Sequence, residues 1–192
     1  MGYDQLRGNP AWVAYRVFAV DEYTTYPRRN YFLIDDRTEN RTSHSTYTNS
    51  GYDRGHMAPN FAIGTRFGQE AQRETFLMTN IVPQRPELNR IWWAKIERLI
   101  AVDYSETYDQ VWVILGPVYE DTGNWIQRVI KIPTGFFMMI MVEDTGKLKI
   151  LTFLEGQDTE PARTTVRRVE KKTGLNFNPL FEEAFADSIE NN

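Results

Sequence analysis

The sequence predicts an α+β protein with a largely antiparallel sheet flanked by helices. Segments with strand patterns come first, a long central helix follows, and further strands precede a late helix. A turn at Asp144, Thr145 and Gly146 separates two apolar segments, which is typical of an antiparallel hairpin. The chain has 192 residues and no Ser/Gly/Pro-rich linker, so we expect one domain over residues 1–192.

The first half of the chain predicts three strands and two loops. Residues 11–20 alternate and are rich in Trp, Val, Tyr and Phe, which predicts a strand, and 30–34 predicts another. The polar stretch 35–46 is expected to be a loop, and 50–61 a loop or an irregular strand end. A short apolar run at 76–82 predicts a buried strand.

Two helices are expected. Residues 86–104 have Pro86 in the first turn and apolar residues at helical spacing. These residues are Leu88, Ile91, Trp92, Ile96, Leu99 and Ile100. An amphipathic helix is expected at 161–172, ending at Thr173–Gly174. Its inward residues would be Ala162, Val166 and Val169.

The remaining strands follow the central helix. A buried strand at 111–115 is expected to be closed by Gly116-Pro117, and 129–133 predicts another strand. The segments 136–142 and 149–154 form the two arms of the predicted hairpin.

Composition excludes several classes of site and partner. There is no cysteine, so disulfides, zinc-finger ligation and cysteine nucleophiles are excluded. The net charge of −4 means that contact with a polyanion has to come from local basic groups. The longest apolar run, 136–142, is far shorter than the roughly 20 residues that span a bilayer, so no membrane contact is expected.

One histidine lies in a sequence context that indicates chemistry. His56, one of only two histidines, follows an Arg-Gly step and precedes Pro59. An imidazole titrates near neutral pH, so it can take a proton from water, as phosphodiester hydrolysis requires. The alternative is a structural histidine that donates to a backbone carbonyl.

The predicted central helix carries possible metal ligands. Asn89 and Glu97 are eight residues apart and hence on nearly the same face, at about 3.6 residues per turn. An amide oxygen with a carboxylate behind it that holds the metal's water suits Mg²⁺, or Mn²⁺ or another divalent ion in its place. Alternatively, both residues are solvated polar residues of a helix face.

Residues beside these groups could bind the substrate. The planar fork of Arg54 could clamp phosphate oxygens, although an ion pair with Asp53 is the usual alternative. Gly55 is expected to permit a backbone angle or a close approach that a side chain would block. Trp92 and Trp93 cannot both face inward, so one of them could stack on a base, although an aromatic residue there is more often part of the core.

These residues resemble the signature of the DNA/RNA non-specific endonucleases, the sugar-non-specific ββα-metal (His-Me finger) nucleases. The resemblance covers most of the chain. It rests on Tyr52-Asp53-Arg54-Gly55-His56, Thr79-Asn80-Ile81-Val82-Pro83-Gln84, Leu88-Asn89, Trp92, Glu97, Gly116-Pro117-Val118-Tyr119, Ile132-Pro133-Thr134-Gly135-Phe136-Phe137 and Thr173-Gly174-Leu175-Asn176-Phe177.

The resemblance implies a ββα-metal core and a Mg²⁺-dependent cleavage of DNA and RNA that leaves 5′-phosphate ends. It implies that His56 activates water, that Asn89 is the only direct protein ligand of one ion, and that Glu97 binds the ion's water. Arg54 would stabilise the transition state, while Asp53 and Asn80 would shape the site by hydrogen bonds.

Two arginines of the family have no clear counterpart. Relatives carry one a helical turn after the glutamate, where this chain has Ala101, so Arg98 or Arg90 is the candidate replacement. Another precedes the motif, and Arg29 or Arg28 is the nearest candidate. The expected nucleic-acid contacts are therefore Arg54, Arg29, Arg90, Arg98 and Trp93.

Other functions remain open on the sequence. The chain could be an inactive nuclease-like domain that binds nucleic acid or a partner protein, or a phosphodiesterase for small substrates. A homodimer and an inhibitor protein are possible partners. Met1 to Asp4 show no signal peptide. Because such an enzyme would damage its own cytoplasm, we expect export with the leader absent from this chain, and a cytoplasmic or organellar location remains the alternative.

Overall fold

The computed structural model describes residues 1–120 and 123–177. Its main feature is a six-stranded antiparallel sheet in the order β1-β2-β5-β8-β9-β10. The strands are β1 (Gly2–Asp4), β2 (Asn9–Val17), β5 (Val111–Val118), β8 (Gly135–Asp144), β9 (Lys147–Gly156) and β10 (Ala162–Thr164). The α+β class with a largely antiparallel sheet is thus confirmed.

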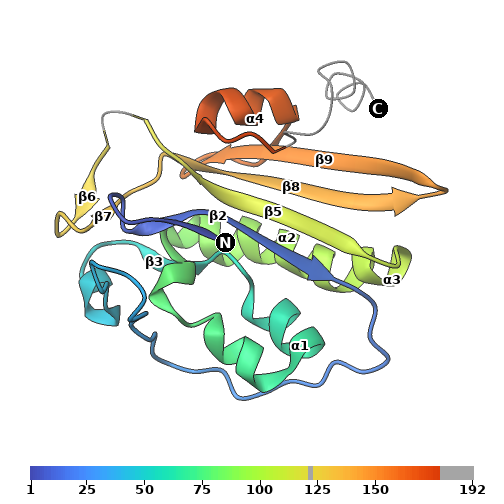
Figure 1. Ribbon diagram of the computed structural model, residues 1–192, viewed down its shortest axis with the longest axis horizontal. Helices are drawn as coiled ribbons and strands as arrows, with labels where there is room; N and C mark the ends of the chain where they lie inside the picture. Colours follow the sequence, from blue (N-terminus) through green and yellow to red (C-terminus); the bar gives the residue numbers. More distant parts are fainter. Residues whose placement is uncertain (121–122, 178–192) are drawn as a thin grey trace.

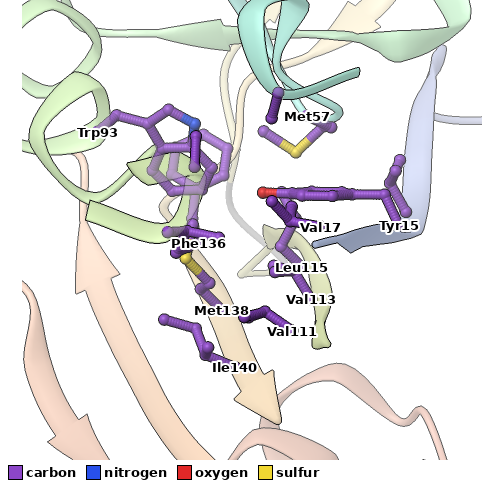
Figure 2. Packing of buried hydrophobic residues seen from close by; sticks show 14 of the residues in the cluster. Tyr15, Val17, Met57, Trp93, Val111, Val113, Leu115, Phe136, Met138 and Ile140 are labelled. Carbon is purple, nitrogen blue, oxygen red and sulfur yellow. The ribbon is translucent and has the colours of Figure 1, made fainter. Parts of the chain in front are cut away.

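Helices cover both faces of this sheet (Figure 1). Helix α4 (Val166–Thr173) lies on one face, where Val169 packs with Phe137 and Met139. On the other face runs a long helix that contains α2 (Ala94–Leu99), and Trp93 and Phe136 belong to the core between them. Figure 2 shows this larger core, with side chains of β2, β5 and β8 meeting Trp93 and Met57.

Two short strands and the long helix that follows them form a ββα unit on one side of the sheet. Strands β3 (Asp53–His56) and β4 (Ile81–Gln84) pair antiparallel, with His56 opposite Ile81 and Asp53 opposite Gln84. Helix α1 (Asn60–Glu74) and a 3₁₀ turn (Met78–Asn80) connect them, and another 3₁₀ turn (His44–Tyr47) precedes β3. Directly after β4 the chain enters the long helix.

The long helix contains two wide-turn segments. It begins near Pro86 and has π-helical geometry over Leu88–Trp93 and Ile100–Tyr104, on either side of α2, before ending in α3 (Ser105–Thr107). The predicted helix at 86–104 is therefore confirmed and extends slightly further. Among the described residues, no helix is both long and apolar enough to cross a membrane.

Several predicted strands differ in the structure. Residues 30–34 form no strand, because Leu33 makes only one bridge, to Leu77. The first strand ends at Val17, before the predicted limit at residue 20. Residues 76–80 form a turn before β4, and the strand expected over 76–82 begins only at Ile81.

Two further strand predictions need correction. Strand β5 does not stop at Gly116-Pro117 but continues to Val118. Because β2 pairs with β5 only as far as Leu115, the missing N–H of Pro117 interrupts no hydrogen bonds on that side. The strand expected over 129–133 is only β7 (Ile130–Lys131), paired with β6 (Trp125–Ile126) in a small hairpin.

The main hairpin is confirmed. Thr145 and Gly146 both have positive φ, which matches the twist of a tight hairpin turn, and Asp144 faces Lys147 across it.

The helix expected at 161–172 begins later than predicted. Residues Ala162–Thr164 instead pair with β9, so Ala162 is exposed rather than inward. Thr165 then caps α4 by accepting a hydrogen bond from the Arg168 backbone N–H, and Gly174 ends the helix with φ 72°. The inward positions of Val166 and Val169 are confirmed.

Helix α1 was not predicted from the sequence. Its apolar positions are few, and two glycines interrupt it, one of which, Gly68, kinks the helix with φ 86° and ψ −176°. That backbone region is accessible essentially only to glycine, so the helical period is broken where a pattern search would need it.

Candidate active site

Strand β3 presents the motif residues at one edge of the ββα unit. Gly55 in its middle lies directly under the buried Gln84 side chain of β4, and a Cβ on Gly55 would collide with the Gln84 amide. The close approach expected of Gly55 is therefore confirmed, and it is made to a side chain across the strand pair. This approach lets β3 carry Asp53 at one end and His56 at the other.

The His56 imidazole is buried between aromatic rings. It is 7% exposed, with ring centroids 5.3 Å from Phe32 and 5.1 Å from Phe76. Burial, with a smaller effect of the Arg28 charge, lowers the pKa of His56 to about 3. Nε2 is buried without a hydrogen-bond partner among the described residues. The imidazole is therefore neutral at pH 7, with a nitrogen that can still bind a proton.

Asn80 holds the backbone that follows His56. Its Oδ1 accepts from the Ala58 N–H at 2.8 Å, and its Nδ2 donates to the carbonyls of Ala58 and Thr75. The Asn80 carbonyl also accepts from the Met57 N–H. The amide is thus fully engaged with backbone, which fits a residue that shapes the site rather than one that contacts a ligand.

Asp53 orients Asn89. The Asn89 Nδ2 donates to Asp53 Oδ2 at 3.0 Å, and Arg90 donates twice to the same carboxylate at 2.8 Å. Although burial opposes the charge, these hydrogen bonds lower the pKa of Asp53. Because its nitrogen is engaged, the Asn89 amide turns its oxygen away from Asp53, where it is available as a neutral ligand.

Glu97 lies half-buried beneath this surface. Burial raises the pKa of Glu97 to about 8, while the Trp93 indole and the Arg28 charge act in the opposite direction. The charge of Glu97 also acts on Tyr15. In Figure 2 the Tyr15 hydroxyl and the Trp93 indole nitrogen face the same part of the core, and neither has another partner in the described chain. Sequence analysis did not single out Tyr15.

These donors fit a hard divalent ion that keeps most of its water. Asn89 offers one neutral oxygen, and a buried carboxyl without an ion-pair partner in the described chain favours a nearby cation. Within residues 1–120 and 123–177 there is no group of three acidic or histidine side chains that could enclose an ion.

The predicted phosphate-binding arginines behave differently from one another. Arg54 forms no ion pair with Asp53. Its Nε and Nη2 donate to the His44 carbonyl, and its guanidinium lies over the Tyr47 ring. Arg29 donates to the Tyr31 hydroxyl on the exposed surface. Arg28 is the neighbour whose charge acts on both His56 and Glu97. Of the two candidates before the motif, the structure favours Arg28.

The other predicted nucleic-acid contacts, Arg90, Arg98 and Trp93, also lie in different surroundings. Arg90 is committed to Asp53, and Arg98 is exposed. Trp93 is 1% exposed and packs edge-on against Phe136. The prediction that Trp93 offers a stacking surface for a base is therefore wrong. Its neighbour Trp92 is the half-exposed residue of the pair, since the core accepts only one of two adjacent helix positions.

Comparison with known protein families identifies one that this chain matches. The family model described as DNA/RNA non-specific endonuclease matches residues 1–184. The chain belongs to this family. The structure of the EndoG/EndoGI complex, titled for the mechanism of EndoG inhibition, aligns with a TM-score of 0.79 and 25% identity over 94% of this chain and 82% of that one. The ββα-metal fold expected of the family is thereby confirmed.

Relatives within the DNA/RNA non-specific endonuclease family are mitochondrial nucleases. The chain is 27% identical over 169 residues to mitochondrial endonuclease G of Homo sapiens, covering 77% of this chain and 56% of the relative. It is 34% identical over 207 residues to mitochondrial nuclease EXOG of Danio rerio, covering 95% and 60%. The chain thus spans little more than half the length of these relatives.

Proposed function

We propose that this chain is a divalent-metal-dependent endonuclease that hydrolyses phosphodiester bonds of DNA and RNA with little regard to sugar or sequence. The observation that carries the proposal is the ββα unit itself. There, β3 presents a buried, neutral His56 at one end, while Asp53 at its other end accepts a hydrogen bond from Asn89, whose amide oxygen has no hydrogen-bond partner in the part of the chain that the structure describes. Family membership and the names of the relatives support the same activity.

In the proposed reaction, His56 takes a proton from a water molecule as that water attacks the phosphorus atom. The bond between phosphorus and the 3′ oxygen then breaks, which leaves a 5′-phosphate end. Asn89 would hold the ion directly and Glu97 through water, with Mg²⁺ the expected ion and Mn²⁺ a substitute. A bound ion supplies positive charge to the phosphate and to the leaving oxygen.

The low pKa of His56 describes the protein without substrate. Burial and the Arg28 charge disfavour the imidazolium. An anionic phosphodiester beside the same groups reverses the electrostatic contribution, because a negative charge stabilises the protonated form. Substrate binding is thus expected to raise the basicity of His56, and Arg28, whose charge acts on His56, and Arg54 of the same strand are the cations that we propose for the phosphate.

Phosphate-dominated contacts account for the proposed lack of sequence preference, because backbone contacts carry no base information. We also infer a single domain over residues 1–192. An inhibitor protein is a possible partner, since the matching structure contains one with a related nuclease. The relatives are mitochondrial, which supports an organellar location. The comparisons give no support to the export expected from the sequence.

The test is cleavage of supercoiled plasmid and of single-stranded RNA by purified protein, with Mg²⁺ and with EDTA. His56→Ala is expected to lose roughly 10²–10⁴-fold in rate or more, as removal of a general base typically does, and to keep its affinity for nucleic acid. His44→Ala is the control, because His44 is the second histidine; its Nδ1 accepts the Phe32 backbone N–H and its ring stacks on Phe32.

Each outcome separates the candidate functions. The proposal is supported if the parent degrades both substrates only with metal and His56→Ala no longer does so. Binding without cleavage would indicate an inactive nuclease-like domain. A preparation that neither binds nor cuts polynucleotides but hydrolyses a small phosphodiester would indicate the phosphodiesterase alternative.

A further inference from the structure

The long helix carries a mainly apolar pocket of about 370 Å³, and its first lining residue, Trp92, comes three positions after Asn89. Its floor consists of Trp92, Ile96 and Leu99 from the helix, and Pro161 from the segment after β9 closes one side. Trp92 and Ile96 also pack against the main core, so the floor is held rigidly from below. We call this cavity the Trp92 pocket.

The rim of the Trp92 pocket is charged. Lys95 and Arg98 supply two cations, and the Lys95 Nζ lies 5.8 Å from the centre of the Trp92 ring. Neither cation has a carboxylate partner within the described residues. Asp103 and Glu160 lie on the same rim. An occupant therefore needs a flat apolar face, a negative charge for the cations and donors for the carboxylates.

A nucleotide has all three properties. Every base offers a π-face that stacks on an aromatic side chain, as the Lys95 ammonium now lies over the Trp92 ring. The phosphate of the nucleotide is attracted to Lys and Arg side chains that have no carboxylate partner. The exocyclic amino groups of bases donate to carboxylates. A purely aliphatic or purely anionic ligand would leave one half of this rim unsatisfied.

The position of the pocket connects it to the proposed chemistry. Trp92 follows Asn89 by three residues within the same wide-turn segment, Leu88–Trp93. The two residues are less than one helical turn apart, so a nucleotide next to a phosphate at Asn89 lies within reach of the pocket. A base inside a duplex cannot, because it is paired and stacked.

We propose that the Trp92 pocket holds one unpaired base of the substrate strand and so favours cleavage of single-stranded or locally opened nucleic acid. This inference rests on the proposed nuclease function. Trp92 acts as a stacking platform, and Lys95 and Arg98 hold the adjacent backbone. The bond-breaking groups of the site are unchanged by the assignment.

The experiment compares Trp92→Ala with Trp112→Ala. Trp112 is a matched control, because it is an exposed tryptophan of β5 with the Arg16 guanidinium 5.8 Å from its ring, outside the pocket. Binding of a fluorescein-labelled single-stranded 12-mer is measured by anisotropy in EDTA, and cleavage of single-stranded and duplex DNA is measured with Mg²⁺. Trp92→Leu is a second variant that keeps apolar packing and removes the π-face.

Trp92→Ala and Trp92→Leu are expected to weaken single-strand binding about 5- to 100-fold, the range that loss of one stacked base implies. Duplex cleavage should stay within about twofold of the parent, and Trp112→Ala should change neither. A folded Trp92→Leu that binds the 12-mer like the parent overturns the proposal. So does an equal loss on duplex, or a changed oligomeric state on size exclusion, which would make the pocket an interface between copies.

The two proposals fail in distinguishable ways. If the parent neither binds nor cleaves any nucleic acid, the proposed function is wrong. If the parent cleaves both substrates and the Trp92 variants discriminate between them as the parent does, only the pocket assignment is wrong.

Discussion

Glu155 occupies a site in the sheet that disfavours its charge. Its Oε2 is buried without a partner among the described residues, and burial raises the pKa of Glu155 to about 8. In an unfolded chain the pKa would be near 4.5. The folded state therefore holds a proton that the unfolded state releases between pH 4.5 and 8. The contribution of Glu155 to the free energy of unfolding is fully present below pH 4.5 and is lost as pH rises through about 8.

Glu155→Gln should remove that pH dependence. We expect equal stability of variant and parent at pH 4.5, and a variant that is progressively more stable toward pH 8, by at most about 1.4 kcal/mol per pH unit. Urea unfolding in EDTA at several pH values measures the difference. Glu143→Gln, at an exposed position of β8, is the control. A constant difference across this range would show that the Glu155 carboxyl is ionised in the fold.

Gly55 illustrates a residue whose identity is set by a neighbour across a strand pair. Gly55→Ala places a Cβ against the buried Gln84 amide, and such overpacking costs about 1–3 kcal/mol. Gln84→Ala removes the obstacle, so the double variant should lose much less than the two single losses added together. A double-mutant cycle by urea unfolding tests this, and strict additivity would contradict it.

At the scale of elements, the π-helical segment at Leu88–Trp93 affects how Asn89 and Glu97 align. In an uninterrupted α-helix, eight residues overshoot two full turns by about 80°. The wider i→i+5 turns hold more residues each, so the same eight residues come closer to two whole turns. The shared face expected from the sequence is thus improved by a departure from α-helical geometry.

Inserting one alanine after Ile91 should misalign the two groups. Ile91 is 55% exposed, so the core loses little, but Asn89 rotates by about 100° relative to Glu97. We expect at least about a 100-fold loss of plasmid cleavage, as misplacement at a reacting centre produces, with an unchanged far-UV circular dichroism spectrum. Ile91→Ala, which keeps the register, should cleave like the parent. A folded insertion variant with parental activity would contradict the need for a shared face.

At the scale of the whole molecule, the proposed ion links the site to global stability. The β3–β4 strand pair and the long helix meet at the contact between Asp53 and Asn89, so an ion bound at Asn89 stabilises both only in the folded state. At ten times its Kd the ion adds about 1.4 kcal/mol, which corresponds to about 3–6 °C in Tm for a chain of this size.

Thermal unfolding with Mg²⁺ and with EDTA measures this effect. The parent should gain the expected increase in Tm with Mg²⁺, and Asn89→Ala should not. Arg85→Ala is a suitable control, because its ion pair with Asp158 lies on the exposed surface. An equal Mg²⁺ response of Asn89→Ala would place the ion elsewhere.

Local patterns predicted much of the architecture. The central helix, the β8–β9 hairpin and the α+β class follow from periodicity and turn residues, which depend only on near neighbours in the chain. The predicted strand at 30–34 and the missed helix α1 show the limit. Leu33 is a residue type common in strands, but it forms only a single bridge to Leu77. Gly68 breaks the helical pattern of α1, yet the helix forms on both sides of it.

The sequence by itself determined the family, the candidate base His56 and the candidate ligand Asn89, because those residues form a motif with fixed spacing. Only the tertiary structure decided that the Arg28 charge acts on His56 while Arg29 donates to Tyr31, and that Trp93 is buried while Trp92 is half-exposed. Neighbouring residues of one type look equivalent in a sequence. Packing distinguishes them, because each position meets a different part of the fold.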